Sequence, residues 1–177
     1  MEWYRFDELE AEVGHALDLR QANTSVSRAG VVRGIHFADL DHAQAKYVTA
    51  TAGAVIDFIV DIRVGSPTFG TWDSVLLDTD SRRAVYIAEG LGHAFVALTE
   101  GATVSYLVTN TYTPGAEHGV SPLDPHIGLD FSAAGVDPIL SEKDRDAPLL
   151  HESAASGSLP TWDASRRLYD ELSTKDR

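Results

Sequence analysis

The sequence contains no cysteine, which excludes disulfide bonds, a thiolate nucleophile and zinc sites with cysteine ligands. It has no apolar run near the roughly 18 residues that span a bilayer, so we expect no association with a membrane. Met1 is followed by Glu2 and Trp3 rather than by a basic segment and then an apolar one. This start lacks the pattern of a secretory signal, and the chain is therefore expected to be cytoplasmic.

Basic residues are also few. The 14 Lys and Arg residues stand against 27 Asp and Glu residues, which gives a formal net charge of −13. A surface of this sign repels nucleic acid, so no nucleic-acid partner is expected. An anionic ligand would need a local group of cations, and Arg33, Lys46 and Arg63 are candidates because they lie in apolar stretches.

Several common site motifs are missing as well. The chain has seven histidines, but His36 is followed by Phe37 and Ala38, so there is no His-x-His pair, and no other pair has ligand spacing on one strand. We therefore predict no metal site. There is no Gly-x-Ser-x-Gly nucleophile elbow. Residues 65–70 lack the lysine of a phosphate-binding loop.

Short segments rich in Val, Ile, Tyr and Phe dominate residues 30–109 and are separated by turn signals. They predict seven strands over residues 30–37, 45–51, 54–63, 74–78, 83–88, 93–99 and 103–109. No helical pattern interrupts this series, which favours an antiparallel sandwich or barrel. A β-roll of this kind has a lumen, and the lumen is the usual ligand site.

Helices are expected only at the two ends of the chain. Residues 7–13 predict a short helix that stops at Gly14, and residues 162–172 predict an amphipathic helix with Thr161 as its N-cap. Residues 114–148 are expected to form long loops around the mouth of the barrel, and 153–160 a linker. We therefore expect one domain over residues 1–150, on which a linker and helix at 151–177 pack.

Strand parity suggests where chemistry could lie, because alternate side chains of a strand share a face. Tyr106 shares its face with Val104 and Val108, and Lys46 shares its face with Val48. With His36, these residues could face one lumen. The ordinary alternatives are a core tyrosine, a lysine at a sheet edge and a structural histidine.

The order of several longer segments resembles one enzyme family, the dTDP-4-dehydrorhamnose 3,5-epimerases and their relatives that act on antibiotic sugars. The matching segments are residues 21–27 (QANTSVS), 30–37 (GVVRGIHF), 43–46 (AQAK), 60–70 (VDIRVGSPTFG), 90–95 (GLGHAF) and 139–144 (ILSEKD). They occur in the family's order across most of the chain.

The resemblance implies a mainly β protein, a cupin-type antiparallel β-roll (jelly-roll barrel) with a few short peripheral helices. It also implies a homodimer that uses neither a metal nor a cofactor. The implied reaction is inversion at C3, at C5 or at both in a dTDP-4-keto-6-deoxyhexose. Such a step belongs to the synthesis of dTDP-L-rhamnose or of an antibiotic deoxysugar.

The resemblance also assigns site residues. His36 matches the family's general base, Asp144 its carboxylate partner, Tyr106 the acid that protonates the opposite face, and Lys46 a lysine near the keto oxygen. The residues that match substrate-binding positions are Arg33, Arg63, Gln21, Asn23, Ser25, His93, Tyr112 and Glu117.

The chemistry needs these residue types. Protons on C3 and C5 are acidic because both carbons flank the C4 ketone, and an imidazole suits their removal near neutral pH. The resulting enolate needs a fixed donor or positive charge, which Lys46 and His93 could supply. Inversion then needs a second acid on the opposite face.

One departure keeps alternatives open. The family's N-terminal strand with its Arg-Gly-x-Phe motif is missing before Glu2, and its arginine would contact the diphosphate. The alternatives are a barrel that binds a sugar nucleotide without turning it over, which this departure favours, and a 3,4-ketoisomerase on the same fold, which fits the motifs less well.

Overall fold

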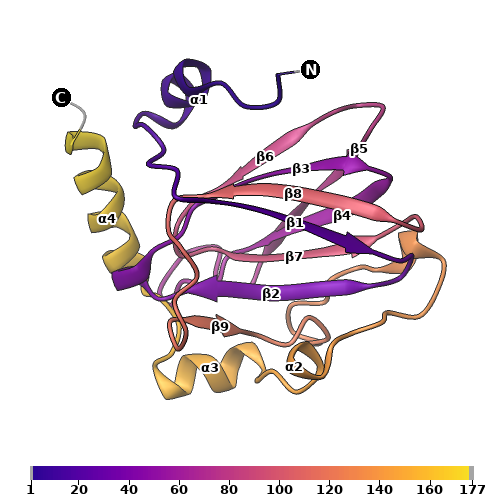
Figure 1. Cartoon of the computed structure of the whole chain (residues 1–177). Coiled ribbons are helices and arrows are strands. Elements are labelled where there is room, and N and C mark those ends of the chain that lie inside the picture. The colour runs from indigo at the N-terminus through magenta and orange to yellow at the C-terminus, as the bar shows by residue number, and fades with distance from the viewer. Residues whose placement is uncertain (1, 176–177) are drawn as a thin grey trace.

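Two antiparallel sheets face each other and form a β-roll, with helices only at its periphery (Figure 1). The computed structural model describes residues 2–175. The strands are β1 (Gln21–Ser27), β2 (Val32–Ala38), β3 (Lys46–Ala52), β4 (Ala54–Val60), β5 (Trp72–Asp78), β6 (Ala84–Ile87), β7 (Gly92–Ala97), β8 (Ala102–Val108) and β9 (Glu117–Gly119). The helices are α1 (Phe6–Val13), α2 (Glu142–Arg145), α3 (Leu150–Ser156) and α4 (Trp162–Lys175), with short 3₁₀ turns η1 (Leu40–His42) and η2 (Ser132–Ala134).

One sheet has four strands in the order β1-β8-β3-β6, and the other has five in the order β5-β4-β7-β2-β9. Neighbouring strands in both sheets are antiparallel. In the four-stranded sheet Tyr106 lies opposite Asn23 on one side and Val48 on the other. The prediction of a mainly antiparallel β fold is confirmed.

Both faces of the five-stranded sheet pack against other parts of the chain. Its inner face contributes Val55, Phe95 and Ala97 to an apolar cluster that fills one part of the roll together with residues of the other sheet such as Val48 and Val104. Its outer face packs under the C-terminal half of the chain through a second cluster. This second cluster includes Val32, Phe58, Val60, Val96, Val120, Ile127, Leu150 and Leu159. Every residue of the central strand β7 is accordingly buried.

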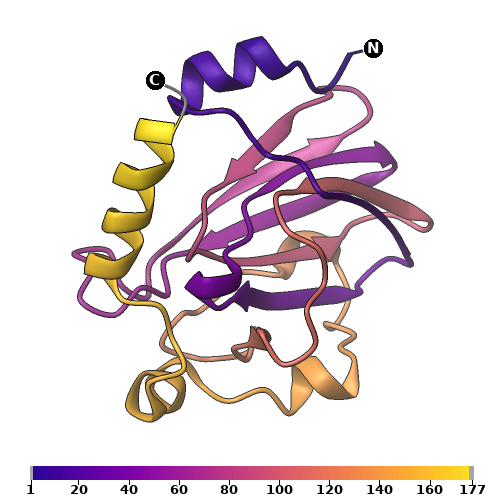
Figure 2. The same ribbon diagram turned by 60° about the vertical axis from the view of Figure 1, so that its left-hand side comes forward.

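The terminal helices form as their end signals predict. Gly14 follows α1 in the left-handed conformation, with φ of 89°, and its N–H donates to the Glu10 carbonyl at 2.8 Å. Thr161 Oγ1 accepts a hydrogen bond from the Ala164 N–H at 3.3 Å at the start of α4. Figures 1 and 2 show α1 and the C-terminal part of α4 near each other at one end of the roll.

The seven predicted strands are present as β2 to β8, with ends that differ by at most three residues. Strand β1 was not among them, because its inward positions Gln21, Asn23 and Ser25 are polar and give no apolar alternation. The short β9 lies within the predicted loop region.

The prediction of a linker over residues 153–160 is wrong for its first part, where α3 runs from Leu150 to Ser156. This helix depends on tertiary contacts that the local sequence does not reveal. The buried Leu150 N–H donates to Asp124 Oδ2 at 2.7 Å, and the Leu149 N–H donates to Glu152 Oε2 at 2.8 Å. Gly157 ends the helix in the left-handed conformation.

Gly34 lets strand β2 approach strand β7 closely. Its φ is 115°, and a Cβ at this position would lie 2.4 Å from the His93 carbonyl oxygen and 2.7 Å from Ala94 Cα. The register between β2 and β7 also shifts between Arg33 and His36. Glycine at this position therefore fits both the backbone conformation and the narrow space between the strands.

We expect Gly34→Ala to lower the free energy of unfolding by about 3 kcal/mol or more, because it adds a steric clash to an unfavourable φ. Gly14→Ala is the matched control, since Gly14 also has a positive φ but no atom within 4 Å of its added Cβ. The control should lose only about 1 kcal/mol. Denaturant unfolding of both variants tests this, and equal losses would contradict the role given to close packing.

Candidate active site

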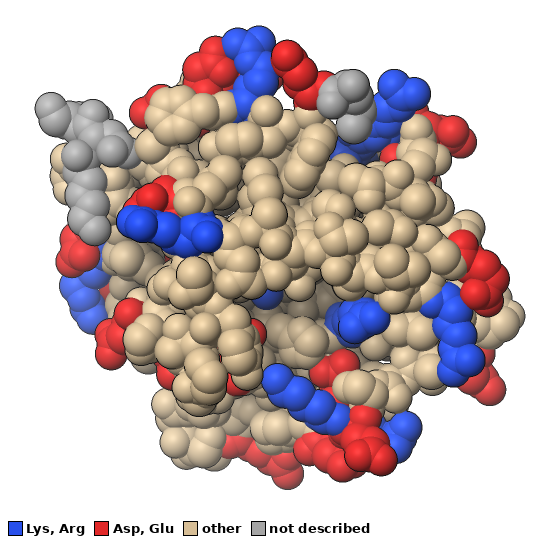
Figure 3. Space-filling view, viewed as in Figure 1, with Lys and Arg blue, Asp and Glu red and all other residues tan. Residues whose placement is uncertain are grey.

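The roll contains two contiguous cavities of about 260 and 130 Å³ that share the side chains of His36, Lys46 and Tyr106. The larger is lined in addition by Gln21, Asn23, Gln44, Tyr112 and Glu117, and the smaller by Ser25, Arg33, His93 and Phe95. These residues come from both sheets and from the loop after β8. The space-filling view is hollowed near its centre, with Lys or Arg atoms at the edge of the hollow (Figure 3).

His36 and Asp144 form a hydrogen-bonded pair across 108 positions of sequence. His36 Nε2 lies 2.6 Å from Asp144 Oδ1. The imidazole is 37% exposed and the carboxylate is 7% exposed. The imidazole is therefore accessible to a ligand, whereas the carboxylate is shielded from solvent. Ser141 caps α2 by accepting the Asp144 N–H at 3.1 Å, which fixes the backbone that carries the carboxylate.

The charge of Asp144 is stabilised in this position. Burial alone would raise its pKa, but the hydrogen bond and charge of His36 and the hydrogen bond of Ser141 outweigh burial and lower it. An ionised carboxylate only accepts hydrogen bonds, so it favours the imidazole tautomer with the proton on Nε2. The other ring nitrogen, Nδ1, is then free to accept a proton.

Lys46 opens β3 and reaches the cavities from the four-stranded sheet. Burial lowers the pKa of its amine, and the nearby carboxylates of Glu117 and Asp57 partly oppose this. A negative charge that develops beside it would favour the ammonium form again. Lys46 can therefore act as a donor to an oxyanion.

Tyr106 lies on β8, in the sheet opposite that of His36. Burial raises the pKa of its phenol, Glu117 raises it further and Arg33 lowers it. The phenol is thus protonated at neutral pH and available as a proton donor. The two proton-carrying groups, His36 and Tyr106, line the same cavities from opposing walls.

A second histidine–carboxylate pair lies deeper in the roll. His93 Nε2 is 2.7 Å from Asp57 Oδ2, and the exposed fractions of the two side chains are 9% and 0%. Sequence reasoning missed Asp57, although a carboxylate inside the apolar strand Ala54–Val60 was a signal for a specific partner. The pair holds His93 at the wall of the smaller cavity.

The structure brings together most of the predicted site residues. Those that line the two cavities are His36, Lys46, Tyr106, Gln21, Asn23, Ser25, Arg33, His93, Tyr112 and Glu117. Asp144 stands behind His36 as its partner. The Ser25 Oγ is buried without a hydrogen-bond partner among the described residues, so it is available to a ligand. Gln44 and Phe95 also line the cavities and were not among the predicted residues.

Arg63 is the exception, because it does not line either cavity. Its Nε and Nη2 each donate to the Asp61 carboxylate at 2.8 Å. Its guanidinium lies 4.5 Å from the ring centroid of Trp162, and its Nη1 is 3.3 Å from Tyr169 Oη. Arg63 thus connects the end of β4 to α4, and the expectation that it lines the pocket is corrected. The local pattern Asp61-x-Arg63 was the available sign of this pairing.

Within residues 2–175, no group of three or more His, Asp or Glu side chains is arranged to hold a metal ion. None of the helices in the same range is long and apolar enough to cross a membrane.

Comparison with known proteins identifies similar chains. A family model described as dTDP-4-dehydrorhamnose 3,5-epimerase matches residues 1–152. The dTDP-4-dehydrorhamnose 3-epimerase of Streptomyces niveus is 52% identical over 162 residues, which are 92% of this chain and 77% of that protein. The dTDP-4-dehydrorhamnose 3,5-epimerase of Mycobacterium tuberculosis is 49% identical over 172 residues, which are 97% of this chain and 85% of that protein.

Solved structures that are similar to this chain are also epimerases. The RmlC epimerase of Mycobacterium tuberculosis matches with a TM-score of 0.94 at 49% identity, over 97% of this chain and 86% of that one. The 3′-monoepimerase ChmJ of Streptomyces bikiniensis, in complex with dTDP-quinovose, matches with a TM-score of 0.93 at 40% identity, over 97% and 86% of the two chains. The expected cupin-type β-roll is confirmed by these neighbours.

The Asp61 cluster predicts a specific dependence of stability on pH. Burial alone would raise the pKa of Asp61, but hydrogen bonds from Arg63, Ser66 and Thr68 hold the pKa well below its usual range. A carboxyl with a lower pKa in the folded state stabilises the fold above its unfolded pKa of about 4, and this contribution is lost as the pH falls further.

Asp61→Asn should therefore lower the free energy of unfolding by about 2 kcal/mol or more at neutral pH, with a difference from the unsubstituted chain that shrinks in acid. Asp170→Asn, at an exposed position of α4, is the matched control and should change little. Denaturant unfolding as a function of pH measures both. A deficit that stays constant down to acidic pH would contradict the electrostatic explanation.

Proposed function

Because the chain belongs to the dTDP-4-dehydrorhamnose 3,5-epimerase family, whose members are isomerases, we propose that it epimerises a dTDP-4-keto-6-deoxyhexose such as dTDP-4-keto-6-deoxy-D-glucose at C3, C5 or both. The resemblance in the sequence is confirmed by the comparisons. The single observation that carries the proposed mechanism is the placement of His36 and Tyr106 on opposing sheets around one cavity. Inversion of a carbon needs proton carriers on both of its faces.

His36 acts as the base in this proposal. Its Nδ1 accepts the proton from the carbon next to the ketone, while Asp144 holds Nε2–H and stabilises the imidazolium that forms. The lowered pKa of Asp144 supports this role, because the carboxylate stays ionised throughout the reaction. The imidazole of His36 is partly exposed and lines the cavities, whereas the Asp144 carboxylate is buried.

Lys46 and His93 stabilise the enolate. Both line the smaller cavity, where burial makes a donor more effective than in water. The Lys46 amine donates to the C4 oxygen as charge develops on it. The hydrogen bond to Asp57 fixes the orientation of the His93 ring, so the ring does not have to reorient before it donates to the enolate oxygen.

Tyr106 returns a proton to the opposite face. Its raised pKa keeps the phenol protonated at neutral pH, and the phenolate formed on donation is close enough to Arg33 to be stabilised by it. The substrate is held by the remaining cavity residues, among which the exposed Arg33 at the rim is suited to an anionic group. Arg63 is not part of this proposal, because it serves the Asp61 cluster.

Relatives that invert one centre and relatives that invert two are similarly close to this chain, at 52% and 49% identity. They also belong to two kinds of pathway. The name of one neighbour, NovW, gives a 4-keto-6-deoxy sugar epimerase of novobiocin biosynthesis, and other names refer to dehydrorhamnose. The number of centres handled is therefore the quantity to measure.

The test is proton NMR of dTDP-4-keto-6-deoxy-D-glucose in deuterated buffer. We expect deuterium at C3, C5 or both with the unsubstituted chain, and about 10²- to 10⁴-fold slower exchange with His36→Ala, because the general base is lost. His126→Ala is the matched control, since His126 is 78% exposed outside the cavities. Tyr106→Phe should still exchange deuterium but should form little inverted product.

Each outcome has a defined meaning. No exchange by a folded, unsubstituted sample would favour a barrel that binds a sugar nucleotide without turnover. Undiminished exchange by His36→Ala would overturn the choice of base. Migration of the keto group without inversion would favour the 3,4-ketoisomerase.

We also propose a homodimer that forms through the outer face of the four-stranded sheet. The outer face of the other sheet is covered by the C-terminal half of the chain, whereas this one exposes Val26 to 63%. Thr24, Ser105 and Thr51 form a row of hydroxyl contacts across three of its strands, at 3.1 and 3.3 Å. Near Tyr47 the N-terminal segment covers part of it, with the rings of Trp3 and Tyr47 stacked at a centroid distance of 5.9 Å.

Light scattering after size exclusion should show a dimer that Val26→Asp converts to a monomer, because the substitution places a charge in a desolvated interface. Val136→Asp is the matched control, since Val136 is 53% exposed in a loop outside this face. A monomer for the unsubstituted chain, or a dimer that Val26→Asp leaves intact, would refute this interface.

A further inference from the structure

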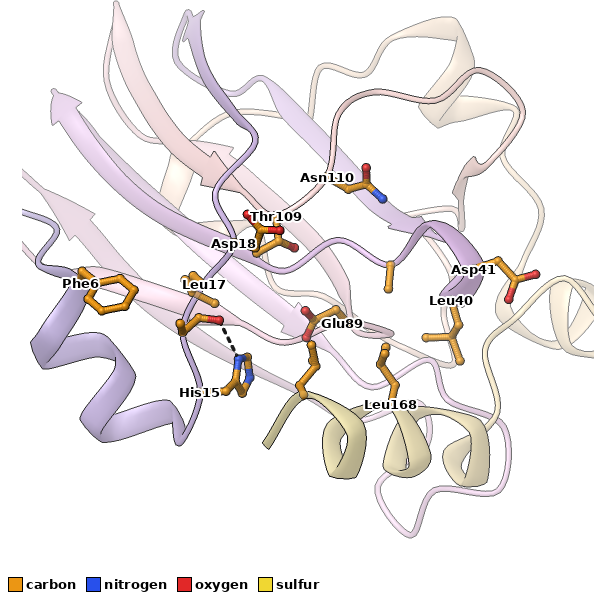
Figure 4. A pocket seen from close by; sticks show the side chains of 13 residues that line it. Phe6, His15, Leu17, Asp18, Leu40, Asp41, Glu89, Thr109, Asn110 and Leu168 are labelled. Atoms are coloured by element: carbon orange, nitrogen blue, oxygen red, sulfur yellow. Dashed lines mark hydrogen bonds between the residues drawn. The ribbon is translucent and has the colours of Figure 1, made fainter. Parts of the chain in front are cut away.

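A second cavity lies outside the proposed active site. It has a volume of about 590 Å³ and lies between the N-terminal segment, η1, the end of β8 and α4 (Figure 4). Its lining residues are Phe6, His15, Ala16, Leu17, Asp18, Leu40, Asp41, Ala43, Glu89, Thr109, Asn110, Leu168 and Leu172. A cavity of this size accommodates a small organic molecule.

The cavity is separate from the lumen of the roll. It shares no lining residue with the two catalytic cavities. Two chain segments next to these cavities are joined by hydrogen bonds, with Ala43, Thr109 and Asn110 lining this cavity and Gln44 lining the larger cavity of the roll. The Ala45 N–H donates to Thr109 Oγ1 at 2.9 Å, and Gln44 Nε2 donates to the Asn110 carbonyl at 3.1 Å. A molecule bound in this cavity would therefore not occupy the substrate site.

The lining combines apolar surface with negative charge. Apolar surface comes from Phe6 and from leucines of the N-terminal segment, η1 and α4. Asp18, Asp41 and Glu89 supply the acidic groups, and the lining contains no Lys or Arg. Such a cavity disfavours an anion and suits a molecule with a cationic group on an apolar body.

Glu89 provides the specific feature of this cavity. The residue is 4% exposed, and its Oε2 is buried without a hydrogen-bond partner among residues 2–175. Burial raises the pKa of Glu89, and three interactions only partly oppose this: a backbone hydrogen bond, the nearby His15 and a side-chain hydrogen bond with the Tyr86 phenol. Figure 4 shows Glu89 among His15 and Leu17 of the N-terminal segment and Leu168 of α4. A buried carboxylate oxygen without a donor is costly, and a bound ammonium would supply that donor.

We propose that this cavity binds an amphipathic organic cation, a primary ammonium that donates to Glu89 Oε2 while its apolar body packs against Phe6, Leu168 and Leu172. The site is independent of the epimerase activity, because no catalytic residue contributes to it. Asp41 adds to the negative potential of the cavity, whereas the charge of Asp18 is paired with Arg20.

Three probes that share one skeleton test the proposal: 4-phenylbutylammonium, the neutral 4-phenylbutanol and the anionic 4-phenylbutyrate. Isothermal titration with the whole chain at a pH of about 8 should show binding of the ammonium, at least about tenfold tighter than that of the alcohol, because only the ammonium makes a charge-assisted hydrogen bond. The carboxylate should not bind. Added dTDP should leave the ammonium in place.

Glu89→Gln should remove the preference for the ammonium over the alcohol. Asp41→Asn is the matched control, since it removes the same charge at an exposed position of the same cavity and should change the ammonium affinity less than about threefold. Thermal unfolding shows whether each variant is folded. Leu168→Trp, which fills part of the cavity and leaves Glu89 unsubstituted, should weaken both the ammonium and the alcohol and serves as the second test.

Three results would overturn the proposal. The first is equal binding of the three probes, or no binding of any. The second is an ammonium preference that folded Glu89→Gln retains, or, if that variant is unfolded, an affinity that Leu168→Trp leaves unchanged. The third is displacement of the ammonium by dTDP, which would place the probe in the catalytic cavity.

Discussion

The two sheets enclose a single interior, and that interior has to be apolar in one part and polar in another. The apolar part, with Val48, Val55 and Val104, supplies the hydrophobic contact that holds the sheets together. The polar part places charged and hydroxyl groups where water is limited, which is costly unless each group has a partner. The hydrogen bonds of His36 to Asp144 and of His93 to Asp57 meet this requirement, and the same bonds orient the two imidazoles.

The two histidine–carboxylate pairs show how one type of contact can serve different tasks. In one pair the imidazole is 37% exposed and can meet a ligand, whereas in the other it is 9% exposed. The more open ring suits proton transfer, since it has to reach a reacting carbon. The more enclosed ring suits a fixed donor, since its position is set by Asp57 before a ligand arrives. Burial rather than residue type thus separates the two proposed roles.

The sequence predicts a strand or a site residue where the polarity of the side chains matches their surroundings in the fold. It does not predict those that depend on contacts between distant segments. Short segments rich in Val, Ile, Tyr and Phe located β2 to β8, because those strands face an apolar core on at least one side. Strand β1 was not predicted in this way, because its residues Gln21, Asn23 and Ser25 are polar and face a polar cavity. The family resemblance named most of the cavity-lining residues, but it also included Arg63, whose partner Asp61 lies two positions away. Neither periodicity nor resemblance found the cavity around Glu89, because it is formed by segments distant in sequence.

The contact between His36 and Asp144 joins residues 108 positions apart. During synthesis on the ribosome, strand β2 with the proposed base His36 is therefore made long before helix α2 with the carboxylate of Asp144. A nascent chain that stops after β8 has the strands of both principal walls but no partner for the imidazole. Chains that stop between β8 and α2 would thus keep most of the roll and lack a competent base. The catalytic pair is thus completed only after the strands of both sheets have been made.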